Sequence, residues 1–107
     1  MTGTRAAVSS PARLSARRLV HALDVHGLPA TVHEGYGIAL VSIQLRLLIW
    51  VECGSYGWHF RWWTGEVSRR TGHWIWALCP AAAASTAARR IVQRYEAVLG
   101  GRPSQYQ

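Results

Sequence analysis

The sequence contains no lysine and no asparagine, and it is poor in acidic side chains. All twelve cationic side chains are arginines, against five Asp and Glu residues, so the formal charge is +7. Lysine and asparagine have AT-rich codons, and their absence beside abundant alanine indicates a GC-rich genome such as that of an actinobacterium. Codon usage therefore explains part of the arginine content. A domain this basic still favours acidic partners, such as nucleic acid, anionic lipid or an acidic protein.

Long apolar runs are also missing. No stretch of about twenty apolar residues predicts a transmembrane helix, and the first eighteen residues lack the apolar segment of a secretory signal. We therefore expect a cytoplasmic bacterial protein without a membrane partner. In that compartment the two cysteines, Cys53 and Cys79, are expected to stay reduced.

Patterns that carry chemistry are scarce. The histidines and cysteines match no zinc-ligand spacing, so we expect no metal and no cofactor. No two carboxylates lie close together, and the sequence has neither a nucleophile elbow nor a P-loop, so no catalytic residue is predicted. A small enzyme with His59 as a base beside Glu52 stays open as an alternative.

The chain length predicts one domain, residues 1–107, with flexible tails at 1–9 and 101–107. Ser10 and Pro11 form a typical helix start, and Gly27 a typical helix end, which predicts a helix over residues 11–26. A second helix is expected to begin at Ser85 or Thr86 and to end at Gly100, because apolar residues recur there at helical spacing.

The middle of the chain predicts an antiparallel meander of about four strands. Alternating and apolar segments at 38–44, 47–53, 58–63 and 73–78 are separated by turn residues, and 30–34 could add a short strand. Residues 64–72 read as a polar loop, and Pro80 is expected to stop the sheet. The order helix, meander, helix predicts an α+β fold, a two-layer sandwich with both helices packed on one face.

Such a sandwich leaves one face of the sheet without a helix. In the segment WHFRWW, strand alternation sends Trp58, Phe60 and Trp62 towards the helices. The other face is then expected to carry polar and aromatic side chains from three strands, namely Ser42, Gln44, Arg46, Trp50, Glu52, His59, Arg61 and Trp63. A one-residue shift of register would exchange the two faces.

We expect this face to bind another macromolecule. The leading interpretation is a non-enzymatic binding or regulatory module, a homodimer or the receptor of an acidic protein, with Arg46, Trp50, His59, Arg61 and Trp63 as the contact face. In a purely structural alternative, Arg61 only stacks on a tryptophan, pairs with Glu52 and stabilises the sheet. A further alternative is single-stranded nucleic acid stacked on the aromatic rings, with phosphate contacts from Arg69, Arg70, Arg89 and Arg90.

Two segments carry a resemblance. YGIALVSIQLRLLIWVECGSYGWHFRWWTG, residues 36–65, and TAARRIVQRYEAV, residues 86–98, resemble small uncharacterised proteins of Streptomyces and related actinobacteria. Those proteins have a comparable WW-T-G strand end and an A-A-R-R opening to the last helix. The resemblance implies the same host type and the helix–meander–helix order, and it carries over no catalytic or binding residue.

Overall fold

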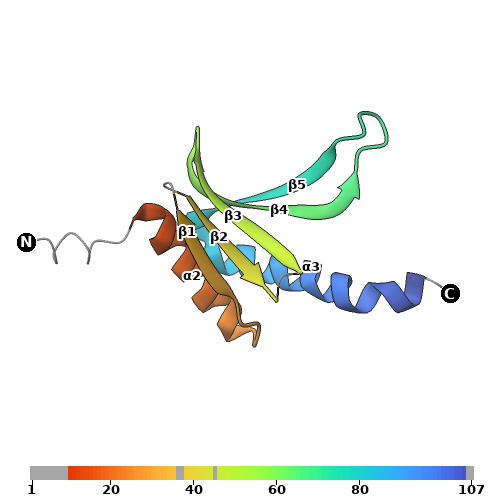
Figure 1. Cartoon of the computed structure of the whole chain (residues 1–107), viewed down its shortest axis with the longest axis horizontal. Coiled ribbons are helices and arrows are strands. Elements are labelled where there is room, and N and C mark those ends of the chain that lie inside the picture. The colour runs from red at the N-terminus through yellow and green to blue at the C-terminus, as the bar shows by residue number, and fades with distance from the viewer. Residues whose placement is uncertain (1–9, 36–37, 45, 106–107) are drawn as a thin grey trace, which may run out of the picture.

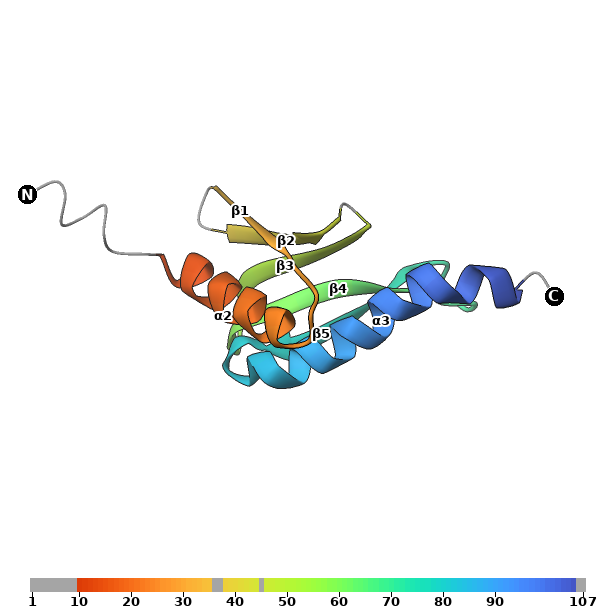
Figure 2. The ribbon, with the colours of Figure 1, turned by 90° about the horizontal axis from the view of Figure 1, so that it is seen from below.

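A computed structural model describes residues 10–35, 38–44 and 46–105 and shows two layers, one of helices and one of strands. In chain order the elements are α2 (Pro11–Val25), β1 (Thr31–Gly35), β2 (Ile38–Ile43), β3 (Leu47–Gly54), β4 (Gly57–Val67), β5 (Trp74–Pro80), the 3₁₀ turn η1 (Ala81–Ala83) and α3 (Ala84–Gln105). The strands form one antiparallel sheet in the order β1-β2-β3-β4-β5. Both helices lie on the same side of it (Figure 1, Figure 2). The predicted α+β sandwich is confirmed, with five strands rather than about four.

Helix α2 begins as the sequence predicts. The Ser10 hydroxyl accepts a hydrogen bond of 3.1 Å from the Arg13 backbone N–H, and Pro11 occupies the first helical position, where its missing N–H is not needed. The helix ends at Val25, one residue before the predicted end. Gly27 follows with a φ of 75°, a left-handed conformation that glycine adopts without a steric penalty.

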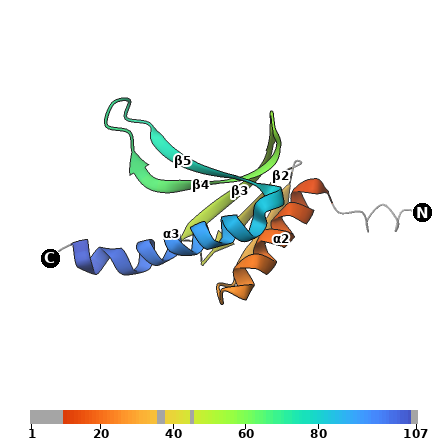
Figure 3. The ribbon, with the colours of Figure 1, turned by 180° about the vertical axis from the view of Figure 1, so that it is seen from behind.

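The β4–β5 hairpin is longer than predicted. Residues 64–67 belong to β4 and not to a loop, because the Thr64 hydroxyl donates to the Ile75 carbonyl at 2.8 Å and Val67 pairs with Trp74 beyond a bulge. Pro80 is the last residue of β5 and lies opposite His59. An edge strand tolerates this proline, since one side of the strand needs no donor. Both ends of the β4 ribbon curl away from the helices (Figure 1, Figure 3).

Helix α3 exceeds its predicted bounds at both ends. It begins at Ala84, before Ser85, because an alanine-rich start favours helix without a capping hydroxyl. It also continues through Gly100 to Gln105, so residues 101–105 are helical rather than a flexible tail. A glycine inside a helix costs only about 1 kcal/mol, which does not stop it. The predicted tail at 1–9 and the last two residues lie outside the described part of the chain.

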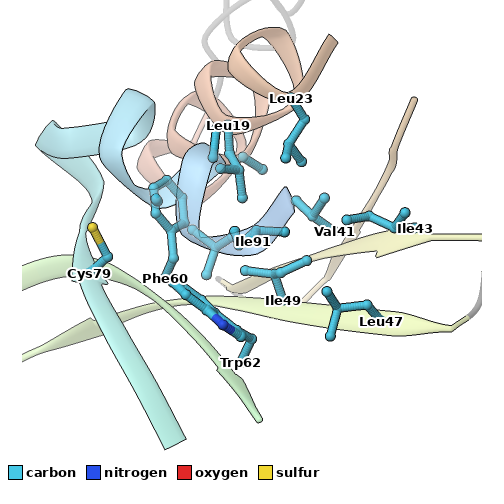
Figure 4. Close-up of a cluster of buried hydrophobic side chains, with 14 of the residues drawn as sticks. Leu19, Leu23, Val41, Ile43, Leu47, Ile49, Phe60, Trp62, Cys79 and Ile91 are labelled. Carbon is cyan, nitrogen blue, oxygen red and sulfur yellow. The ribbon is translucent and has the colours of Figure 1, made fainter. Parts of the chain in front are cut away.

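The core lies between the helices and the inner face of the sheet. Leu19 and Leu23 of α2 and Ile91 of α3 point towards Phe60 and the β2–β3 side chains (Figure 4). The inward positions are those that strand alternation predicts, and they are buried, namely Ala39, Val41, Ile43, Leu47, Ile49, Val51, Phe60, Trp62, Ala77 and Cys79. Trp58 is half-buried against the same cluster. The face assignment of Phe60 and Trp62 is therefore confirmed.

Candidate functional site: the open face of the sheet

The open face is the side of the sheet opposite the helices. Alternation along four paired strands gives it a central set of side chains, namely Leu40, Leu48, Trp50, Glu52, His59, Arg61, Trp63, Trp74, Trp76 and Leu78. Across the strands, Leu40 lies opposite Trp50, Trp50 opposite Arg61, and Arg61 opposite Leu78. Arg61 is therefore at the middle of this face, with its neighbours fixed by strand register.

Arg61 is held by contacts within the chain. Its Nε donates to Glu52 Oε1 at 3.1 Å and its Nη2 donates to Glu52 Oε2 at 2.7 Å, a two-pronged ion pair. The guanidinium carbon also lies 4.3 Å from the centre of the Trp76 ring and 5.8 Å from that of Trp50. The structure thus contains the contacts required by the alternative in which Arg61 only stabilises the sheet. The positive charge of Arg61 is balanced by the carboxylate of Glu52.

Glu52 lies between the side chains of Arg61 and His59. The hydrogen bonds from Arg61 lower the pKa of this carboxyl below its usual range, against the opposing effect of burial, and the charges of Arg61 and His59 lower it further. His59 Nε2 lies 3.6 Å from Glu52 Oε1, and His59 Nδ1 lies 3.4 Å from the Gly57 carbonyl oxygen. A carboxylate bound in this way is a weaker base than a free glutamate.

Three tryptophans line the end of the open face near the β4–β5 hairpin. The rings of Trp63 and Trp74 stack with centres 4.1 Å apart, and the Trp76 ring lies 5.9 Å from that of Trp74. The Trp63 indole N–H donates to the Glu66 carbonyl at 2.9 Å. Trp74 is nevertheless 53% exposed and Trp76 39% exposed. Their stacking orders the rings without covering them.

Sequence reasoning placed β5 but did not assign its residues to this face. Trp76 and Leu78 follow from the same rule as Arg61, because side chains two positions apart on a strand share a face. Leu78, at 55% exposed, and Leu48, at 42%, add aliphatic surface beside the rings. The face is therefore more apolar than the sequence prediction, which stressed its polar members.

Three predicted members of the face need correction. Ser42 is buried and its hydroxyl lies 3.1 Å from His33 Nε2, so it is not available at the surface. Gln44 follows β2 with a φ of 51°, and its amide oxygen accepts a hydrogen bond of 2.7 Å from the Tyr95 hydroxyl on α3. Its side chain reaches the helix layer because the strand has ended. Arg46 is exposed in the β2–β3 turn, at the margin of the face.

The structure does not gather the four predicted phosphate ligands. Arg69 and Arg70 are exposed in the β4–β5 turn, whereas Arg89 and Arg90 lie on α3, in the helix layer. Arg90 is also engaged, since it donates to the Leu78 carbonyl at 3.1 Å and lies 5.1 Å from the Trp62 ring centre. Arg89 and Arg90 therefore lie on the other layer from the open face, whereas Arg69 and Arg70 belong to the hairpin that carries Trp74.

Metal sites, disulfides and membrane-spanning helices each place requirements on the described residues. Among the described residues, no three His, Cys, Asp or Glu side chains come together in a way that could hold a metal ion. Cys53 is exposed, Cys79 is buried, and both are free thiols. None of the helices in the described ranges is both long and apolar enough to cross a bilayer. Comparison with protein-family models, curated proteins and solved structures finds no match to this chain.

Proposed function

We propose that this chain is a protein-binding module that self-associates through the open face of its sheet. The observation that carries the proposal is the combination of exposed apolar side chains with a neutralised centre. Trp74, Trp76 and Leu78 are 53%, 39% and 55% exposed, and they lie along β5 beside an Arg61 that is already paired with Glu52. A contiguous apolar surface of this kind is typical of a contact site.

A role in stabilising the sheet explains only some of the side chains on the open face. The contacts of Arg61 with Glu52 and Trp76 explain why these residues strengthen β3, β4 and β5. They do not explain Leu78, whose side chain is more than half exposed on an edge strand. Burying such side chains against a partner removes apolar area from water, at about 25 cal/mol for each Å².

A second copy is the occupant that this surface favours. Most of the described arginines lie on α2 and α3, on the opposite layer, so two chains of charge +7 repel each other least when their open faces meet. In a twofold dimer the same surface of both copies forms the contact. An apolar face with a paired charge at its centre is complementary to an identical face in such a dimer. An acidic protein partner would instead bind the arginines of the helix layer.

The test compares two exposed apolar residues replaced by the same charge. Leu78→Arg, on the open face, is expected to convert the dimer into an 11.9 kDa monomer with an unchanged circular dichroism spectrum. Val25→Arg, at the end of α2 and 74% exposed, is the matched control and should stay dimeric. Mass in solution, measured by sedimentation, distinguishes them.

Two results would count against self-association. If Val25→Arg and Leu78→Arg have the same mass, the open face is not the interface. Nucleic acid is the competing occupant, favoured by Arg69 and Arg70 on the hairpin that presents Trp74. A monomer that binds a short single-stranded oligonucleotide, with affinity that falls steeply as salt is added and drops in Trp74→Ala, would support that function instead.

A further inference from the structure

A hollow lies where β4 and β5 extend beyond the start of β3. Its volume is about 430 Å³, within the range of about 300–1,000 Å³ that small-molecule sites occupy. The β2–β3 turn bounds it on one side and the tryptophans of the β4–β5 hairpin on the other, with α3 below. Trp50, Trp63, Trp74 and Trp76 line it, together with aliphatic side chains and two arginines, Arg46 and Arg94.

The extension that creates the hollow is built into the hairpin. β3 first pairs with β4 at Ile49 and Trp62, so β4 continues to Val67 with no β3 neighbour beyond that point. Arg94 of α3 fills the space beneath, donating to the Trp63 carbonyl at 3.3 Å. A methyl group at Gly65 would lie 2.6 Å from Arg94 Nη2, which shows how closely the guanidinium packs on this strand.

The lining has a one-sided chemistry. Indole rings offer flat apolar surface for stacking, while both charged groups that line the hollow are guanidinium groups. None of the described residues that line it is acidic. Arg46 is exposed at the rim, in a turn that its own backbone N–H fixes by donating to the Ile43 carbonyl at 2.9 Å. An anionic group can meet this arginine while an apolar body lies on the rings.

From this arrangement we infer that the hollow binds an organic acid with a flat apolar body. The body stacks on the tryptophans, and the carboxylate accepts hydrogen bonds from Arg46, since a guanidinium fork matches a carboxylate geometrically. A cation of the same shape is disfavoured by the two arginines. This site goes beyond the proposed interface in using residues of the β2–β3 turn and of α3, but it shares Trp74 and Trp76 with that interface. The ligand and self-association are therefore expected to compete for these two rings.

The experiment uses three probes that share one ring system and differ in charge: 2-naphthoate, 2-naphthamide and 2-naphthylmethylammonium. Binding is followed through the tryptophan indole N–H signals in proton–nitrogen NMR spectra, assigned by single Trp→Phe replacements. Because the proposed interface would cover Trp74 and Trp76, the titrations use the monomeric Leu78→Arg variant beside the wild type. In the monomer we expect naphthoate to shift the Trp50, Trp74 and Trp76 signals and to leave that of Trp62 unmoved, since Trp62 is buried in the core. Naphthoate should bind at least about tenfold more tightly than the amide, and the cation least.

Matched variants locate the anionic group. Arg46→Gln should abolish the preference for naphthoate over the amide, and Arg89→Gln, an identical change on exposed α3 surface, should leave it intact. The assignment is overturned if the three probes bind equally, if naphthoate moves no tryptophan signal, or if Arg46→Gln behaves as the wild type.

The same spectra separate this site from the proposed interface. Leu78→Arg should still bind naphthoate as a monomer, because Leu78 does not line the hollow. Loss of binding in that monomer would overturn the assignment of the site to a single chain. If the wild type is itself a monomer that binds naphthoate, the proposed interface fails and the hollow stands.

Discussion

Arg61 donates two hydrogen bonds to Glu52 and lies over the Trp76 ring, so the central cation of the open face is satisfied within the chain. A side chain fixed in this way offers an apolar guanidinium face and a balanced charge to any partner. At the scale of single residues, this one ion pair favours an apolar protein contact over a phosphate contact on the face.

Replacing Glu52 by Gln should reduce stability in a pH-dependent way. Because the pKa of Glu52 is lowered in the folded state, its contribution is present above about pH 4.5 and is lost as the pH falls through the lower folded-state pKa. We expect Glu52→Gln to lose about 1 kcal/mol at neutral pH, and the difference from the wild type to shrink in acid. Urea unfolding at several pH values measures both.

Glu66→Gln is the control for that experiment. Glu66 is exposed, and its backbone carbonyl, which accepts from Trp63, survives the substitution. An equal effect of the two variants at neutral pH, or a Glu52→Gln deficit that persists unchanged in acid, would show that the ion pair does not stabilise the face.

At the scale of elements, the β4–β5 hairpin shapes both the face and the hollow. Its strands extend past β3 and curl away from the helices (Figure 3). Arg94 of α3 reaches β4 by donating a hydrogen bond to the Trp63 carbonyl. Gly65 permits this contact, because it has a φ of 92° and lies directly over the guanidinium. The extended part of the hairpin thus contacts the helix layer through Arg94, near the bulge.

Gly65→Ala should therefore destabilise the fold more than Gly72→Ala. Both glycines have positive φ, 92° and 75°, so each substitution carries a backbone strain of about 1–2 kcal/mol. Only at Gly65 would the new methyl group also displace Arg94, whereas nothing lies within 4 Å of the same position at Gly72. The midpoints of urea unfolding give the comparison.

An Arg94→Ala background checks the cause. If Arg94 is responsible for the extra loss, the two alanine substitutions at Gly65 and Gly72 should cost about the same once that side chain is removed. A difference that persists in Arg94→Ala would show that the hairpin is anchored by another contact.

The elements were predictable where local rules act alone. Capping residues and apolar residues at helical spacing located the two helices, and the start of α2 followed from Ser10 and Pro11. Alternation and turn residues located the sheet and its inner face. Tertiary contacts decided the rest. The Gln44 side chain contacts Tyr95 because β2 ends before Gln44. Thr64 belongs to β4 because its hydroxyl donates a hydrogen bond to the carbonyl of Ile75, eleven residues further along the chain. The open face was predictable in outline, but its apolar character depends on β5, a strand that the sequence located without an assignment of its side chains to a face.

At the scale of the whole molecule, most of the arginines lie on the helix layer and the most exposed tryptophans lie on the sheet. Most of the described arginines belong to α2 and α3, while Trp74 and Trp76 lie on the open face beside Leu48 and Leu78. The ends of β4 curl away from the helices, which gives this face a coiled shape (Figure 1). We expect two such sheets to pack with their strands crossing at a large angle, since coiled sheets do not stack in parallel over their full length.

The measurement that tests the proposed self-association most directly is a dilution series of the wild type, followed by mass and tryptophan emission together. The proposal predicts twice 11.9 kDa at high concentration and 11.9 kDa on dilution. The emission should shift to the red over the same range, because Trp74 and Trp76 return to water as the faces separate. A mass of 11.9 kDa and an unchanged emission spectrum at every concentration would contradict it.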